Sequence, residues 1–97
     1  MSIVIIAEIE PSPRDAATVR EALLTAVTRV RSEDDGCERY ELHRDPRTGG
    51  FVMVERWRDQ AALDAHAAGP GFAALSAALE GRLAGPIALR PLEPVEV

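Results

Sequence analysis

Residues 51–66 constrain the fold most strongly, because a strand pattern there runs directly into a helix pattern. Large side chains alternate with their neighbours from Phe51 to Trp57, which is the period of a strand and places Glu55 on the same face as Trp57. The helix that follows ends near His66, so an aromatic ring, an acid and a base are expected around one cavity. This grouping predicts a small-molecule site. The alternative is a buried tryptophan beside a surface histidine.

Two helices are expected after this strand. Asp59 can cap the first, and the apolar side of that helix, Leu63 and Ala67, is expected to fold back on the sheet. Glycine and proline in residues 69–71 interrupt the chain before the second helix. The apolar stripe predicted for the second helix consists of Phe72, Leu75, Leu79 and Leu83.

The N-terminal third predicts a strand followed by a long helix. Residues 3–10 alternate with one continuous apolar face, which is typical of a strand packed on a core. Ser12 and Pro13 predict the helix start, as N-cap and first helical residue, and Gly36 is expected to end the helix in the left-handed conformation. The three acids at residues 33–35 oppose the helix dipole and are expected to be solvated.

Residues 37–44 and 51–57 are expected to pair as a hairpin around a loop rich in turn residues. One register collects the bulky groups on a single face, namely Tyr40, Leu42, Phe51, Met53, Glu55 and Trp57. A slip of one residue would instead place on the tryptophan side Cys37, Arg39, Glu41 and His43. The first register is favoured because it gathers the large apolar side chains.

The elements follow one another as strand, helix, strand, strand, short helix, helix and strand, in a single domain of residues 1–97. This order predicts an α+β fold, a ferredoxin-like split βαββααβ protomer with an antiparallel sheet covered by helices on one side. The uncovered sheet face is expected to meet a second copy of the chain. Residues 87–97 are expected to form an edge or exchanged strand, because Pro91 and Pro94 do not suit a central one.

The composition excludes several classes of function. A net charge of −5 without any lysine provides no basic patch for a nucleic acid. No apolar run approaches the ~20 residues that span a membrane, and residues 1–6 lack the basic segment of a signal peptide. The single cysteine, Cys37, fits a reducing compartment, so a cytoplasmic location is expected. With two histidines far from this cysteine, no metal site is predicted.

Three residues could bind and deprotonate a small molecule. Tyr40 and Trp57 suit packing against a flat aromatic ligand, since each joins a large apolar body to one hydrogen-bonding group. Burial in the core is the alternative for both. His66 could accept a proton near neutral pH. A solvent-facing or helix-capping role is the alternative for this histidine.

Glu55 is unusual because a carboxylate between large apolar neighbours is costly to bury without a partner. Arg56, Arg39 or Tyr40 is expected to supply that partner. If Glu55 were instead a general base, burial would raise its pKa. Cys37 has no neighbouring base and is expected to pack as a small apolar residue.

Five short segments together resemble the antibiotic biosynthesis monooxygenase domain. They are Gly36-Cys37, Tyr40-Glu41-Leu42, Glu55-Arg56-Trp57, Ala62-Leu63-Asp64-Ala65-His66 and Pro70-Gly71-Phe72, and their order and spacing extend over nearly the whole chain. The resemblance implies a dimeric α+β barrel, in which two ferredoxin-like protomers pack sheet to sheet. It also implies that the C-terminal strand reaches across to the partner.

Known members of this family include cofactor-free monooxygenases that oxidise quinols, anthrones and similar phenolic compounds. The resemblance implies that Trp57 is the pocket tryptophan, Glu55 the acid of the same motif and His66 the helix histidine. Tyr40 joins them from the predicted hairpin register. The residues expected to bind substrate are Trp57, Tyr40, Met53 and Phe72, and those expected to be catalytic are His66 and Glu55.

Together with the residues, the resemblance implies a homodimer that oxygenates an electron-rich aromatic such as a hydroquinone, naphthol or anthrone, with dioxygen as co-substrate and no cofactor. His66 would act as base, and Glu55 would position the histidine or a substrate hydroxyl. A non-catalytic small-molecule-binding or stress-associated barrel and an oxygen-independent isomerase are the alternatives. The haem-degrading enzymes of the same superfamily use an asparagine on the first strand and a haem-ligating histidine on the helix after the tryptophan. Resemblance to them is disfavoured, because this chain has no asparagine and the corresponding residues 74–77 contain no histidine.

Overall fold

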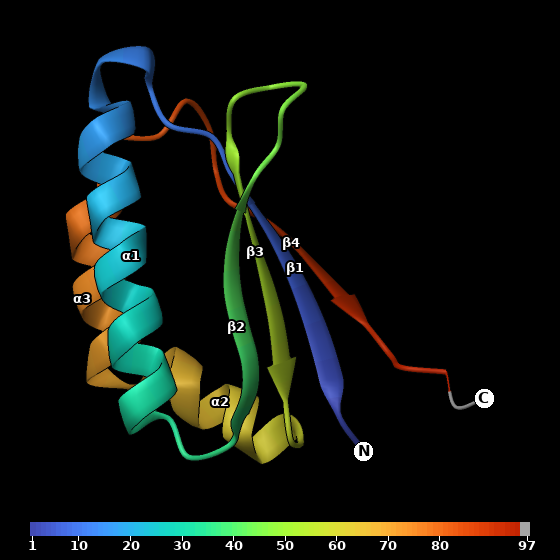
Figure 1. The fold of residues 1–97 in the computed structure, drawn as a ribbon. Coiled ribbons are helices and arrows are strands. Elements are labelled where there is room, and N and C mark those ends of the chain that lie inside the picture. The colour runs from blue at the N-terminus through green and yellow to red at the C-terminus, as the bar shows by residue number, and fades with distance from the viewer. Residues whose placement is uncertain (96–97) are drawn as a thin grey trace.

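The computed structural model describes residues 1–95, and Figure 1 shows their helices on one side of a single sheet. In chain order the elements are β1 (Ile3–Ile9), the 3-10 turn η1 (Pro13–Asp15), α1 (Ala16–Glu33), β2 (Cys37–Arg44), β3 (Phe51–Trp57), α2 (Gln60–Ala68), α3 (Pro70–Leu79) and β4 (Ala88–Leu92). The strands lie in the order β2-β3-β1-β4, and every neighbouring pair is antiparallel. The predicted ferredoxin-like α+β fold is confirmed.

The hairpin of β2 and β3 has the predicted register. Tyr40 lies opposite Glu55, and Leu42 lies opposite Met53. Every second residue of β3 is buried, and the residues between them are half-buried on the other face. The large side chains of both strands therefore share the face that the helices cover.

The core lies between this sheet face and the helices α1 and α3. The amphipathic spacing of α1 buries one stripe of the helix, made of Val19, Leu23, Ala26 and Val30. Leu75 and Leu79 contribute the matching side of α3. Burying each of the larger aliphatic side chains stabilises the fold by ~1.5–3 kcal/mol. This packing holds α1 and α3 against the sheet and fixes the loops at their ends.

The loop after α1 contains a glycine for a different reason from the one predicted. Gly36 does not adopt the left-handed conformation, since among the described residues only Gly49 and Gly81 have a positive φ. Position 36 requires glycine for space, because a Cβ there would collide with the Cβ of Ala62. The backbone N–H of Arg58 also donates to the Gly36 carbonyl at 2.9 Å. The loop after α1 therefore packs directly on the start of α2.

Two helix boundaries differ from the prediction. Ser12 makes no side-chain capping hydrogen bond, and Pro13 begins a 3-10 turn rather than α1 itself. α3 ends at Leu79, and the chain turns at Gly81, which has a φ of 74°. Leu83 therefore lies beyond the helix rather than on its stripe.

No helix in residues 1–95 is long and apolar enough to cross a membrane.

The predicted apolar side of α2 is confirmed for Leu63, which packs against the core, and is wrong for Ala67. Ala67 is exposed and Leu63 is half-buried, while His66 is the buried residue of this helix. Asp59 caps α2 as expected, because its carboxylate accepts a hydrogen bond from the backbone N–H of Ala62 at 2.8 Å.

β4 is an edge strand, as its proline predicted. It pairs only with β1 among the described residues, with Pro91 opposite Ile5, and all its residues are exposed. Figure 1 shows β4 extending away from the helices. Exchange of this strand with a partner stays a prediction. Residues 96–97 of the predicted C-terminal segment lie outside the described residues.

Candidate active site

The imidazole of His66 lies among three aromatic rings from three different elements. Its centroid is 4.4 Å from the Trp57 ring, with the planes tilted by 30°, and 5.7 Å from Tyr40 and 5.4 Å from Phe72. The rings of Tyr40 and Phe72 approach it edge-on, which is a preferred arrangement of aromatic pairs. His66 is 6% exposed and Trp57 is fully buried, so the alternative of a solvent-facing histidine is wrong.

The fold assembles this cluster from distant parts of the chain. Trp57 ends β3, and Tyr40 lies on the neighbouring strand β2. His66 lies in the last turn of α2, and Phe72 lies in the first turn of α3. Gly69 alone separates these two helices, so Phe72 follows the turn directly and packs against the imidazole.

Glu55 is buried beside this cluster and has a partner that the sequence analysis did not anticipate. The indole N–H of Trp57 donates to Oε1 of Glu55 at 3.0 Å. The predicted partner Arg56 instead forms an ion pair with Glu38 at 3.2 Å, on the other face of the sheet. Arg39 likewise pairs with Glu41. The predicted pairing of Glu55 with either arginine is therefore wrong. A strand's two-residue period brings acid and indole together on one face, which makes their hydrogen bond a local one.

Burial changes the titration of three groups in this region. Removal from water raises the pKa of Glu55, although the Trp57 N–H and the nearby His66 both oppose this effect. Burial, reinforced by the Glu55 carboxylate, also raises the pKa of Tyr40, so the phenol keeps its proton and can donate a hydrogen bond. Burial likewise raises the pKa of the Cys37 thiol, which disfavours a nucleophilic thiolate.

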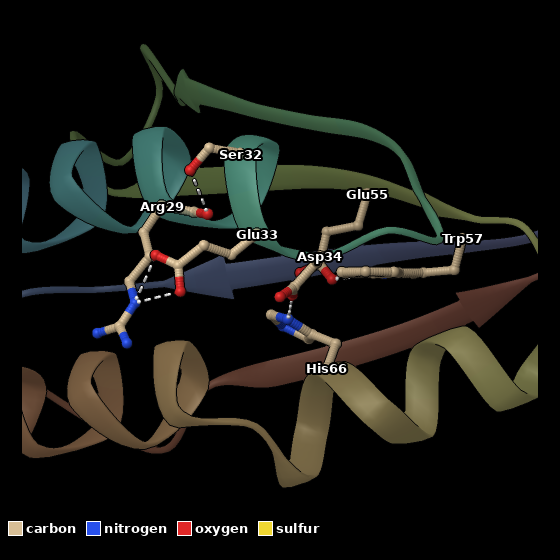
Figure 2. A network of polar contacts seen from close by, with 7 residues as sticks. All are labelled: Arg29, Ser32, Glu33, Asp34, Glu55, Trp57 and His66. Atoms are coloured by element: carbon tan, nitrogen blue, oxygen red, sulfur yellow. Dashed lines mark hydrogen bonds and ion pairs between the residues drawn. The ribbon is translucent and has the colours of Figure 1, made fainter.

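Asp34, which was expected to be solvated, lies against His66. Its Oδ2 is 2.6 Å from Nδ1 of His66, and Figure 2 shows the two side chains directed at each other. The Asp34 side chain is 26% exposed, whereas that of the next residue, Asp35, is 99% exposed. The prediction was therefore wrong for Asp34, and no periodicity distinguishes it from the acids on either side.

A cleft of about 410 Å³ opens beside this acid–imidazole pair. It lies between the end of α1, the β3–α2 loop and the junction of α2 with α3. The residues that line it include Asp34, Gly36, Arg58, Ala62, His66 and Pro70. His66 is among the residues that line this cleft, although its side chain is only 5% exposed.

The structure brings together most of the predicted site residues, namely Tyr40, Glu55, Trp57, His66 and Phe72. Met53 lies on the same face of β3 and is 1% exposed within the core. The second histidine, His43, is exposed on the opposite face of the sheet. Within residues 1–95, no group of three or more potential ligand side chains could hold a metal ion.

A ferredoxin-like fold with an imidazole, an acid and aromatic rings enclosed beneath its helices defines a small α+β protein, and this cluster is its candidate site. The sequence matches the antibiotic biosynthesis monooxygenase family over residues 2–78. The chain belongs to this family, and the resemblance inferred from its short segments is confirmed.

Similar proteins extend over nearly the full length of the chain. It is 33% identical over 94 residues to a Mycobacterium tuberculosis protein named "Putative monooxygenase Rv0793", and the match covers 97% of this chain and 92% of that protein. The solved structure of Rv0793 superposes with a TM-score of 0.93 at 30% identity, covering 100% of this chain and 98% of Rv0793. PA3566 from Pseudomonas aeruginosa gives a TM-score of 0.88 at 30% identity, covering 98% and 95% of the two chains. These similarities support a monooxygenase-like function in general terms.

Proposed function

We propose that this protein is a monooxygenase that oxidises an electron-rich aromatic compound, such as a hydroquinone, naphthol or anthrone, with dioxygen and without a cofactor. The observation that carries the proposal is the buried imidazole of His66, which Asp34 holds from one side and Trp57 covers from another. A base set among aromatic rings suits a flat substrate with an acidic proton. The family and its named relatives support the oxygenase class.

The reaction would begin with transfer of a substrate proton to Nε2 of His66. The resulting carbanion gives one electron to dioxygen, and the two radicals join through a new C–O bond. The peroxide takes the proton back from His66, its O–O bond breaks, and the same carbon loses its remaining proton. One oxygen atom stays as a carbonyl and the other leaves in water. The substrate thus loses two hydrogens and gains one oxygen, with dioxygen as the only oxidant.

The groups around His66 would bind and orient the ring of the substrate. Trp57 and Phe72 offer apolar surfaces on two sides of the imidazole, and the protonated phenol of Tyr40 can donate to a substrate oxygen. Glu55 holds the Trp57 indole through their hydrogen bond. Because Trp57 is fully buried, a substrate entering from the cleft must displace side chains to reach it.

Oxygen uptake by metal-stripped protein tests this proposal. A panel of hydroquinones, naphthols and anthrones is compared with a protein-free blank, because these compounds also oxidise spontaneously. Uptake above the blank, with one labelled oxygen atom from dioxygen in the product, is the expected result. Quenching of Trp57 fluorescence without uptake would contradict it and favour a binding protein. Conversion of panel compounds without oxygen would contradict it and favour an isomerase.

We also propose that the protein is a homodimer that packs through the sheet face away from the helices. The apolar residues that β1 and β3 place on this face are Val4, Ile6, Val52 and Val54, all half-buried in one protomer. Arg39, Glu41 and Arg56 share the face, so it carries both signs of charge for pairing across a twofold axis. A small domain of this kind gains stability by burying such a face.

β4 would complete the dimer by contacting the partner. Leu89 is 62% exposed and Leu92 is 45% exposed, and the two project to opposite faces of β4. An edge strand with apolar side chains on both faces is a surface that a second copy can cover. Analytical ultracentrifugation should show a dimer at micromolar concentration. A monomer that persists at the highest soluble concentration would contradict this part of the proposal.

A further inference from the structure

The hydrogen bond between Asp34 and His66 determines which imidazole nitrogen is free. Asp34 Oδ2 lies 2.6 Å from Nδ1 of His66, which is within hydrogen-bond distance. An ionised carboxylate can only accept a hydrogen bond, so Nδ1 must carry the proton. A neutral imidazole held in this way has its lone pair on Nε2.

We infer that Asp34 is a positioning residue, which holds His66 in the tautomer whose Nε2 accepts the substrate proton. This inference rests on the proposed monooxygenase function, in which His66 is the base. It assigns to Asp34 the role that the sequence analysis gave to Glu55. Asp34 acts through the histidine and contacts no reacting atom of the substrate.

The other acids near this region have different partners. Glu55 is occupied by Trp57, whose indole N–H donates to Oε1 at 3.0 Å. Glu33 lies next to Asp34 in sequence, but its carboxylate pairs with Arg29 one turn earlier on α1, at 3.1 Å. Figure 2 shows the Arg29–Glu33 interaction apart from the Asp34–His66 pair. The side chain that orients the imidazole is therefore that of Asp34.

The backbone holds Asp34 in place independently of its carboxylate. The N–H of Asp34 donates to the Val30 carbonyl and its own carbonyl accepts from the Cys37 N–H, both at 3.0 Å. Two residues later, Gly36 packs against Ala62, one turn before the histidine on α2. Exchange of the carboxylate for an amide of the same shape should leave the loop where it is. Only the hydrogen bond to Nδ1 should change.

Nitrogen NMR of the His66 imidazole tests the tautomer directly. In the wild-type protein, at a pH where the imidazole nitrogen signals show the neutral ring, Nδ1 should carry the proton and Nε2 the lone pair. In Asp34→Asn the amide can donate to Nδ1, and the proton should move to Nε2. The matched control Asp35→Asn changes the neighbouring acid, which is 99% exposed, and should leave the tautomer unchanged.

Steady-state kinetics of the same variants separate positioning from binding. Asp34→Asn should lower kcat by ~10²-fold or more with little change in KM, because the base is then in the wrong tautomer. Asp34→Glu keeps a carboxylate and should recover part of the loss. Asp35→Asn should behave as the wild type. Circular dichroism of each variant confirms that the comparison is made on folded protein.

Three results would overturn the inference. The first is a wild-type imidazole with its proton on Nε2, and the second is one protonated on both nitrogens throughout the pH range of turnover. The third is an Asp34→Asn protein with unchanged tautomer and unchanged kcat. If no aromatic compound is turned over but the spectra show the proton on Nδ1, then the proposed substrate class fails and the positioning by Asp34 stands. The two failures are therefore distinguishable.

Discussion

The two faces of β3 carry different kinds of side chains, although the residues are neighbours in sequence. The face beneath the helices holds Glu55 and Trp57, which are buried and joined by a hydrogen bond. The other face holds Val54 and Arg56, which are half-buried in the protomer. Because successive strand residues point to opposite sides, the candidate chemistry and the proposed association surface are separated by one step along the chain. Whether a residue of β3 points toward the helices or away from them therefore determines whether a substitution affects the candidate site or the proposed association surface.

The two histidines give the largest expected contrast between these faces. His66→Ala should lower kcat by ~10²–10⁴-fold, which is the usual contribution of a general base. His43→Ala, on the opposite face and exposed, should leave kcat unchanged. Rates of oxygen uptake at saturating substrate provide the measurement. Equal rates for both variants would remove His66 from the role of base.

A charge placed on the sheet face away from the helices should affect dimer formation and not catalysis. Val54→Asp should weaken the proposed dimer by ~10²-fold or more, since like charges brought together across an interface cost several kcal/mol. Sedimentation over a range of concentrations measures the change. Thr18→Asp adds the same charge on the exposed side of α1 and should leave the dimer intact. A Val54→Asp protein that dimerises as the wild type does would place the interface elsewhere.

The helix-covered face of β3 could be predicted from the sequence, because strand periodicity and the hairpin turn define it. The bulky residues of both strands select one register, and the structure has that register, with Tyr40 opposite Glu55. The same periodicity placed Glu55 and Trp57 side by side. It could not reveal their hydrogen bond, because the rotation of the side chains depends on burial and on which competing groups are near.

Asp34 could not be found in this way, because its role depends on tertiary geometry. Its partner His66 lies 32 positions away on another helix, and an acid just beyond a helix end has no period that indicates its direction. The exposure of Ala67 was missed for a related reason. Ala67 is apolar and His66 polar, so apolar patterning selected Ala67 for burial, whereas the structure buries His66. A polar residue buried against the predicted pattern is often part of a functional site.

The next test, with a smaller expected effect, concerns the contact between Gly36 and Ala62, which brings the loop that contains Asp34 close to α2. Gly36→Ala should lower the free energy of unfolding by about 1–3 kcal/mol, because the added Cβ meets the Cβ of Ala62. Urea unfolding measures the change. Gly85→Ala is the matched control, since a Cβ there meets nothing within 4 Å. Ala62→Gly in the Gly36→Ala background should restore part of the stability, and an additive result instead would contradict the proposed collision.

The smallest expected effect concerns the buried charge of Glu55. Burial raises the pKa of Glu55 in the folded protein above its value in the unfolded chain. Between these two values the folded state binds more protons, so the free energy of unfolding falls as the pH rises. Glu55→Gln removes this loss and keeps an oxygen that can accept from the Trp57 N–H. The melting temperature of Glu55→Gln relative to wild type should therefore be higher at neutral pH than in acid. Glu21→Gln, on the exposed side of α1, is the control. If the difference in melting temperature between Glu55→Gln and wild type is the same at both pH values, the partners of Glu55 offset the free-energy cost of burying its charge.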